Sequence, residues 1–257
     1  MPDTTTVKDL LARAAEYLAS HSGKKEDEDD SRYPGEAADR ILAYFENRDK
    51  TAIEVFNDTA KKIYEGEERK PLENDVLVKR LYSDSIGKIF NRFSWLHMYI
   101  SMDYYNKVDY LWAGSAAGIM DFYSRKLSHL YDFVDKMYLH TTDKGICTLI
   151  DYILANPQAD LRLKTAAESV FLSYSYLSSS FFAKTGLHYN EYIVVVKMSR
   201  AAYLLSNTDM KIYEICQEVS YQDTNYFTRQ FKKIYGVSPS EYKSMGEADA
   251  ALDSACL

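Results

Sequence analysis

The chain has 257 residues, of which 46% are hydrophobic and 27% charged, and its formal net charge at pH 7 is −7. This length and apolar content suffice for a packed core in one large or two modest domains, and they argue against a disordered chain. Ten glycines and five prolines leave few natural breaks, while Leu, Ala, Lys, Glu and Tyr are plentiful, so the composition predicts an all-α protein.

The cysteines argue against both a disulfide framework and a metal cluster, because Cys147, Cys216 and Cys256 are widely spaced and form no C-x-x-C pair. No stretch of about 18 uncharged apolar residues occurs, so no membrane span or secretion signal is expected. No nucleophile triad, phosphate loop or pair of catalytic carboxylates stands out. We therefore expect a soluble, cytoplasmic protein that is not an enzyme and carries no metal and no cofactor.

The acidic charge is unevenly distributed along the chain. Residues 1–145 carry a formal charge of −5, and residues 246–257, predicted to be a disordered acidic tail, carry −3. Residues 146–245 carry +1, which is a weak basic signal. Because phosphate contacts provide much of the affinity for nucleic acid, charge alone does not favour DNA binding, although most of the acidic charge lies outside this block.

Residues 1–145 are predicted to form a helical regulatory or dimerisation region. An amphipathic helix is expected at residues 7–20, followed by a polar, flexible linker or loop at residues 21–35. From residue 36 to residue 140 the apolar residues recur with the period of a helix, and no strand-like alternation competes. This pattern argues against a doubly wound receiver domain and against a β-barrel sugar pocket as the sensor.

An aromatic-rich stretch runs from Phe90 to Trp112. Large rings with polar tips suit a concave ligand pocket. The same composition also suits a helix–helix core or a dimer face, which is the more common arrangement. The sequence leaves these interpretations open.

The C-terminal block contains an internal repeat with an offset of fifty positions. Six pairs of identical residues coincide at this offset: Glu168 and Glu218, Tyr176 and Tyr226, Phe181 and Phe231, Gly186 and Gly236, Glu191 and Glu241, and Tyr192 and Tyr242. So many coincidences among residues with distinct structural roles indicate two copies of one supersecondary unit.

The second copy has the pattern of a helix, a tight turn and another helix. Residues 211–219 place four apolar side chains on one helical face, and Asp223 is positioned to cap a helix over residues 224–235. Four side chains of this helix are predicted to be buried: Tyr226, Phe227, Phe231 and Ile234. Six polar or basic side chains are predicted to face outward: Thr224, Asn225, Thr228, Arg229, Lys232 and Lys233. A DNA-recognition helix needs this division, because one polar face enters the major groove.

The end of this helix is also marked in the sequence. Gly236 is placed to end it in the left-handed conformation. Ser238 and Glu241 then form a capping box, with Pro239 at the first position of a short final helix. The capping residues therefore agree with the helical period.

The first copy spans residues 163–186 and is poorer in charge. Ser173 is the expected cap of its second helix, and Lys184 is the only basic residue there. The outward positions of that helix are Tyr174, Ser175, Ser178 and Ser179. A connecting helix is predicted at residues 188–206, about 25 Å long. Two recognition helices held in this way could reach successive major grooves, which are about 34–36 Å apart.

Residues 146–245 resemble the DNA-binding domain of the AraC/XylS family of bacterial transcription regulators. The stretch KIYEICQEVSYQDTNYFTRQFKKIYGVSPSEYK is similar to that family's signature nearly throughout, and so are YLSSSFFAKTG and KMSRAAYLL before it. The resemblance implies two helix-turn-helix subdomains joined by the connecting helix. It also implies a sequence-specific regulator of transcription, an activator by family analogy, whose partner is double-stranded DNA.

The resemblance assigns roles to individual residues. It maps base-contacting positions onto six residues: Ser175, Ser178, Ser179, Thr224, Asn225 and Thr228. Three basic residues are candidates for positioning or phosphate contacts: Arg229, Lys232 and Lys233. RNA polymerase and a second copy of the chain, bound through the N-terminal helices, are further candidate partners, whereas the sequence identifies no effector.

The chain departs from the family pattern at several positions. The second unit has Cys216 and Ser220-Tyr221 where a small Ala and Gly-Phe are usual, and Lys197 stands where Arg is usual. Phe182-Ala183 replace basic residues in the first unit. These departures leave an alternative in which the C-terminal block is a regulatory protein-interaction module with weakened DNA binding.

Overall fold

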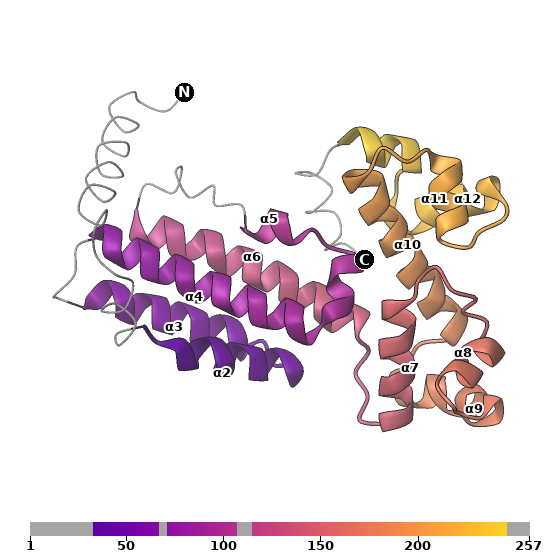
Figure 1. The fold of residues 1–257 in the computed structure, drawn as a ribbon, viewed down its shortest axis with the longest axis horizontal. Coiled ribbons are helices and arrows are strands. Elements are labelled where there is room, and N and C mark those ends of the chain that lie inside the picture. Colours follow the sequence, from indigo (N-terminus) through magenta and orange to yellow (C-terminus); the bar gives the residue numbers. More distant parts are fainter. Residues whose placement is uncertain (1–32, 67–70, 107–114, 246–257) are drawn as a thin grey trace. The chain divides into compact units, whose positions relative to one another are not determined.

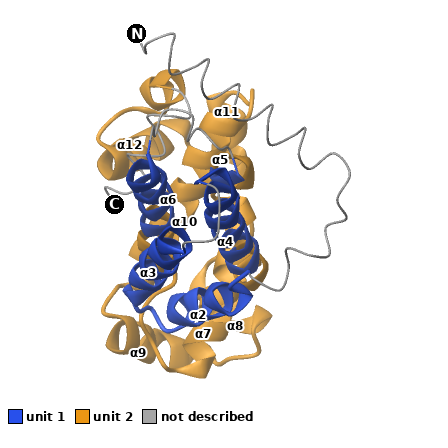
Figure 2. Ribbon diagram, turned by 90° about the vertical axis from the view of Figure 1, so that its left-hand side faces the viewer, with its two compact units in different colours: residues 1–89, 105–128 blue, residues 90–104, 129–257 orange. Residues whose placement is uncertain are grey.

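The computed structural model describes three stretches of the chain: residues 33–66, 71–106 and 115–245. Their regular secondary structure is helical, which confirms the predicted all-α fold class. The predicted helix at residues 7–20, nearly all of the 21–35 segment and the acidic tail 246–257 lie outside the described residues. The chain divides into two compact units, which Figure 2 colours separately.

The helices follow one another in chain order as Figure 1 shows. The N-terminal half contains α2 (Gly35–Glu46), α3 (Thr51–Glu65), α4 (Pro71–Arg92), the 3-10 helix η3 (Ser94–Met98), α5 (Met102–Asn106) and α6 (Ala116–Met137). The C-terminal half contains α7 (Lys144–Ala155), α8 (Leu163–Ser169), α9 (Tyr174–Thr185), α10 (Tyr189–Asn207), α11 (Ile212–Glu218) and α12 (Thr224–Tyr235). A short helix over residues 239–245 ends the described chain.

The two units do not divide the chain at a single point. Unit 1 comprises Met1–Ile89 and Tyr105–Ser128, and unit 2 comprises Phe90–Tyr104 and His129–Leu257. The division therefore falls within α4, α5 and α6, and unit 2 begins upstream of the repeat. The domain boundary at residue 145, suggested by sequence, stays a prediction.

Unit 1 packs its helices around aromatic side chains. Tyr82 of α4 stacks on Tyr123 of α6 with ring centroids 4.5 Å apart, and Phe56 of α3 meets Tyr82 edge-on at 6.4 Å. Asn57 Nδ2 donates a hydrogen bond of 3.1 Å to Ser124 Oγ, which joins α3 to α6 at the edge of this core. The apolar period read from the sequence therefore corresponds to a helical core, as expected.

The described part of the aromatic-rich stretch forms a core in unit 2. Phe93, Trp95 and Tyr99 are nearly fully buried. Trp95 lies edge-on to Tyr99 at 5.9 Å and close to Phe133 of α6 at 6.4 Å. These rings pack against one another, as the helix-core interpretation predicts for them.

Three hydrogen bonds fasten these upstream segments to the C-terminal helices of unit 2. The Tyr99 hydroxyl donates to the Leu154 carbonyl of α7 at 2.8 Å. The Tyr192 hydroxyl of α10 donates to the Met137 carbonyl at 2.9 Å, and Arg200 Nη1 donates to the Met98 carbonyl at 2.5 Å. Because buried carbonyls need partners, these bonds make residues 90–104 and 129–137 part of one folded body with the repeat.

Other kinds of site are not found in the part of the chain that the structure describes. No helix there is long and apolar enough to cross a membrane. No group of three or more His, Cys, Asp or Glu side chains is arranged to hold a metal ion within those residues. Cys147 and Cys216 are free thiols.

Replacing Tyr99 by Phe tests the fastening of the upstream segment. Burial raises the pKa of the Tyr99 hydroxyl far above its usual range, so this group acts as a neutral donor to the Leu154 carbonyl. Tyr99→Phe removes that donor alone and should lower the free energy of unfolding by about 1 kcal/mol. Urea unfolding measures the change. The matched variant Tyr174→Phe alters an exposed hydroxyl and should leave stability unchanged; equal effects of the two variants would contradict this role.

Candidate nucleic-acid interface

The second helix-turn-helix unit is built from α11, a tight turn and α12. Asp223 caps α12 as predicted, since its Oδ1 accepts hydrogen bonds from the backbone N–H groups of Asn225 at 2.8 Å and Tyr226 at 3.1 Å. Phe227 and Phe231 lie one helical turn apart on α12, and both side chains are completely buried. The cap fixes where the helix begins, and the two rings fix which of its faces points outward.

The outward face of α12 carries the predicted polar and basic residues. Five of the six are exposed, and Thr228 is half-buried; the exposed ones are Thr224, Asn225, Arg229, Lys232 and Lys233. Asn225 lies in the first turn of the helix, whereas Lys232 and Lys233 lie in the last. Polar side chains at the helix start and cations at its end match the needs of base readout and phosphate contact, respectively.

Tyr226 was predicted to be buried, and this is wrong. Its side chain is 44% exposed, because it lies one position before Phe227 and so points about 100° away from the buried face. Its ring lies 5.9 Å from the ring of Tyr221 and 5.9 Å from the guanidinium carbon of Arg229. Ile234, also expected inside, is half-buried. The outward surface of α12 is thus more aromatic than predicted.

The first helix-turn-helix unit, which lies within the compact unit 2, is formed by α8 and α9 and is built in the same way. Ser173 Oγ accepts from the Tyr176 N–H at 3.2 Å, which confirms the predicted cap. Ser175, Ser178 and Ser179 are exposed on α9. The Ser179 hydroxyl lies within hydrogen-bond distance of two carbonyls of its own helix, at 2.9 and 3.1 Å, so in the free protein its proton is already used.

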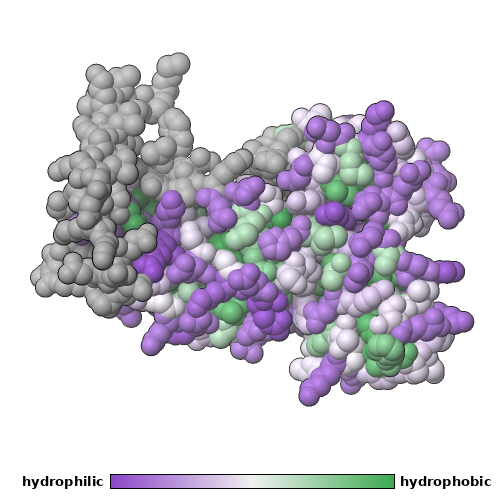
Figure 3. Space-filling model, in the orientation of Figure 1, coloured by the Kyte–Doolittle hydropathy of each residue, from purple (hydrophilic) through white to green (hydrophobic). Residues whose placement is uncertain are grey.

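The surface around the first unit is more apolar than that around the second. Phe171, Tyr174 and Phe182 are 97%, 54% and 51% exposed. The Phe182 ring stacks on His188 at 4.4 Å. In Figure 3 the surface around α12 is mostly hydrophilic, whereas α9 carries an apolar patch. The three basic residues predicted to contact phosphates, Arg229, Lys232 and Lys233, all lie in the second unit.

The two units superpose residue by residue only from their second helices onward. Gly186 and Gly236 both end a helix in the left-handed conformation, with φ of 73° and 76°. The first helices, however, correspond at an offset of 49, since α8 and α11 each have seven residues and start at 163 and 212. Glu168 is therefore structurally equivalent to Gln217, and its predicted pairing with Glu218 is wrong. The turn of the second unit is one residue longer.

The connecting helix α10 joins the units, as Figure 1 shows. It has 19 residues and is therefore about 28 Å long. Phe181 of the first unit lies against Tyr192 with ring centroids 5.9 Å apart. Phe231 lies against Tyr242 at 5.3 Å in the equivalent place of the second unit. The first pair joins α9 to α10, whereas the second joins α12 to the short final helix of residues 239–245.

Several carboxylates around the interface are held in their charged form by hydrogen bonds. Bonds from the Arg162 side chain and backbone hold the pKa of Asp160 far below its usual range. The Tyr176 hydroxyl, at 2.5 Å, and the Ile146 N–H lower the pKa of Asp143. The carboxylate of Glu241 accepts from the Ser238 N–H at 2.7 Å, which forms the predicted capping box. These carboxylates accept hydrogen bonds from backbone and side-chain groups of unit 2, and the charge of Lys232 on α12 also helps to lower the pKa of Glu241.

The comparisons with known proteins agree with this geometry. A family model described as a helix-turn-helix domain matches residues 166–245. The chain is 39% identical over 85 residues to the Msm operon regulatory protein of Streptococcus mutans, which covers 33% of this chain and 31% of that protein. It is 32% identical over 94 residues to the lactose operon transcription activator of Staphylococcus xylosus, which covers 37% of this chain and 34% of that protein. The chain thus spans about a third of the length of the curated relatives it matches.

A solved structure also matches the C-terminal block. It is the C-terminal domain of the two-component response regulator yesN from Fusobacterium nucleatum, with 30% identity and a TM-score of 0.36. The match covers 39% of this chain and 99% of that chain.

Gly236→Ala tests the left-handed end of α12. A β-carbon meets no atom within 4 Å at this position, but φ of 76° strains any L side chain. We expect the free energy of unfolding to fall by about 1–2 kcal/mol, measured by urea unfolding. The control is Gly87→Ala inside α4, where there is also nothing within 4 Å and the backbone is helical. That variant should raise stability by up to about 1 kcal/mol, and two changes of the same sign would contradict the assignment.

The pH dependence of unfolding tests the Asp160 cluster. Because the folded-state pKa of Asp160 lies below its unfolded value of about 3.9, its contribution is present above that value. It is lost as the pH falls through the folded pKa. Asp160→Asn should therefore flatten the loss of stability between pH 5 and pH 2, as measured by thermal unfolding. The exposed Asp209→Asn is the control, and an equally steep loss in Asp160→Asn and the parent protein would show that the cluster contributes nothing.

Proposed function

We propose that the protein is a sequence-specific transcription regulator of the AraC type that binds double-stranded DNA, because residues 166–245 match a helix-turn-helix domain and the chain is similar to an operon regulatory protein. The observation that carries the proposal is the outward face of α12. It combines small polar side chains in the first turn with Lys232 and Lys233 in the last, on a helix fixed by Asp223 and Phe231. Proteins of this family regulate transcription rather than catalyse reactions.

In the proposed complex α12 enters the major groove and supplies most of the affinity. Thr224, Asn225 and Thr228 read base edges, and an Asn side chain suits the donor and acceptor of adenine. Arg229, Lys232 and Lys233 contact phosphates on either side of the groove. Tyr226, on the same surface, adds an aromatic ring beside Arg229 that sequence reasoning did not anticipate.

The first unit is proposed to occupy the neighbouring major groove. Its candidate contacts are the hydroxyls of Ser175, Ser178 and Ser179, which form short-range hydrogen bonds. A helix of about 28 Å between two recognition helices is compatible with grooves about 34–36 Å apart, because each helix itself adds width. With few cations on α9, this unit refines position or base preference rather than adding much phosphate binding.

We further propose that the protein is an activator. The Staphylococcus xylosus relative is named a transcription activator, and it is 32% identical to this chain over 94 residues. RNA polymerase as a partner and a homodimer formed through residues 1–145 stay predictions. The helical unit 1 is the candidate region for sensing an effector.

The alternative, a protein-interaction module with weakened DNA binding, is favoured by one observation. The first unit exposes Phe171, Tyr174 and Phe182 and carries few cations.

Binding to a selected duplex at 50 to 200 mM salt separates the two functions. A regulator of the proposed kind loses affinity steeply as salt rises, because each neutralised phosphate releases counterions. Negligible binding at every salt concentration would support the interaction module instead.

Two substitutions on α12 should have different effects on DNA binding. Lys232→Ala should weaken binding to all sequences alike and reduce the salt slope by about 1, because one phosphate contact is lost. Asn225→Ala should cost about 1–3 kcal/mol at one base pair and relax the preference there. Fluorescence anisotropy with a set of single-base operator variants measures both. Lys61→Ala on α3, an exposed cation of unit 1, is the control. If Asn225→Ala changed all sequences equally, its role in base readout would be wrong.

A further inference from the structure

We propose that Ser220, the Gln158 carbonyl and Lys197 form a brace that sets the orientation of the two recognition helices relative to each other. The consequence for DNA rests on the proposed function: the brace selects the spacing between the two half-sites. The brace itself is a property of the free protein and can be tested without DNA.

The central contact joins the two helix-turn-helix units directly. Ser220 lies in the turn between α11 and α12, and Gln158 lies in the loop between α7 and α8. The Ser220 hydroxyl donates to the Gln158 carbonyl at 2.5 Å, although 62 residues separate them in the chain. A second connection between the units therefore exists beside α10.

The backbone at Ser220 favours a residue without a side chain. Its φ is 59°, in the left-handed region where glycine is free of strain and most other residues are not. A glycine would form the same turn, so the feature that the serine adds is its hydroxyl. Phe171 has a φ of 57° at the equivalent position of the first unit, but its side chain is 97% exposed. The bridge is thus specific to the second unit.

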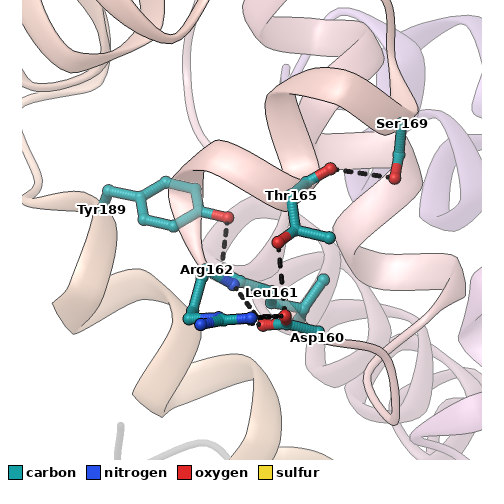
Figure 4. Close-up of polar contacts among 6 residues, drawn as sticks. All are labelled: Asp160, Leu161, Arg162, Thr165, Ser169 and Tyr189. Carbon is teal, nitrogen blue, oxygen red and sulfur yellow. Dashed lines mark hydrogen bonds and ion pairs between the residues drawn. The ribbon is translucent and has the colours of Figure 1, made fainter.

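The loop that presents the Gln158 carbonyl is itself held firmly, as Figure 4 shows. The carboxylate of Asp160 accepts from the Arg162 N–H at 3.1 Å, from Arg162 Nη2 at 2.6 Å and from Thr165 Oγ1 at 3.2 Å. The Tyr189 hydroxyl of α10 donates to the Leu161 carbonyl at 2.8 Å. Because this loop is tied to both α8 and α10, its carbonyl is a fixed point for Ser220.

Lys197 supplies the second part of the brace. It lies on α10 and is only 8% exposed. Its Nζ is 5.8 Å from the centroid of the Tyr221 ring, in the turn of the second unit. Burial lowers the pKa of this ammonium group, and the charge of Asp160, in the loop before α8, opposes that shift in part. A nearly buried ammonium group is stabilised by such partners. Lys197 therefore links α10 to the turn that carries Ser220.

Both helix-turn-helix units pack against α10, and the brace adds a contact between their loops that limits the remaining rotation of one unit relative to the other. With the brace, the recognition helices are already oriented when the protein meets DNA, so less conformational entropy is lost on binding. One spacing of half-sites is then preferred over its neighbours. Without the brace the units would adapt to several spacings with similar affinity.

Distance measurements in the free protein test the brace. Spin labels are introduced through unnatural amino acids at Lys184 on α9 and Lys233 on α12, and pulsed electron paramagnetic resonance gives the distance distribution. We expect one narrow distribution in the parent protein and a clearly broader one in Ser220→Gly, which keeps the turn but lacks the hydroxyl. Ser220→Asn tolerates the left-handed conformation and offers an N–H donor, so it should restore the narrow distribution.

Matched variants separate the brace from a general effect on stability. Phe171→Gly relieves the same backbone conformation in the first unit and should leave the distribution unchanged. Lys197→Met keeps the buried volume but removes the charge, and it should broaden the distribution. Thermal unfolding of Ser220→Gly should be unchanged or occur at a higher temperature, since strain is removed. An unchanged distribution in both Ser220→Gly and Lys197→Met overturns the brace.

A DNA arm tests the consequence. Operators whose half-sites are moved apart or together by one base pair should bind the parent protein more weakly than the best spacing does. In Ser220→Gly the ratio of the affinity for the best spacing to that for an altered spacing should fall by about fivefold, which corresponds to the loss of one net hydrogen bond. If the parent protein bound none of the operators, the proposed function would be contradicted. The distances measured in the free protein would still test whether the brace exists.

Discussion

Burial of the central helix α10 is the constraint on which both helix-turn-helix units depend. The first half of α10 buries Tyr192 against Phe181 of α9. Its second half contributes Met198, Ala201 and Leu205 to the core beneath α12. Each unit has too few apolar residues to enclose a core alone, so α10 completes both. It also carries nearly buried cations, whose burial is offset by a carbonyl and by aromatic rings.

This shared core explains how two similar units can differ in their outward chemistry. The residues that face α10 are constrained by packing, whereas those that face outward are free to vary. The second unit has accordingly kept Arg229, Lys232 and Lys233, while the first exposes serines and aromatic rings. Upstream, Tyr99 and Arg200 attach the segments of residues 90–104 and 129–137 to the same helices.

Local features of the site could be predicted from the sequence with good accuracy. Ser173, Asp223 and Gly236 were identified because capping depends on bonds to residues two to four positions away. The period of apolar residues also identified the outward face of α12. The same period wrongly predicted that Tyr226 is buried, because a tyrosine at the border of the buried face can pack inward or lie outside. The repeat gave the wrong offset for the first helices of the two units, because identical residues at one spacing do not reveal an added residue in a turn.

The sequence by itself determined the helices, their caps, the repeat and the family resemblance, since all of these depend on neighbouring residues or on regular spacing. Only the tertiary structure decided that residues 90–104 and 129–137 belong to the same unit as the repeat. It alone brought Ser220 to Gln158 and Lys197 to Tyr221. These contacts join residues far apart in the chain, and their geometry follows from how whole helices pack. No local pattern records such packing.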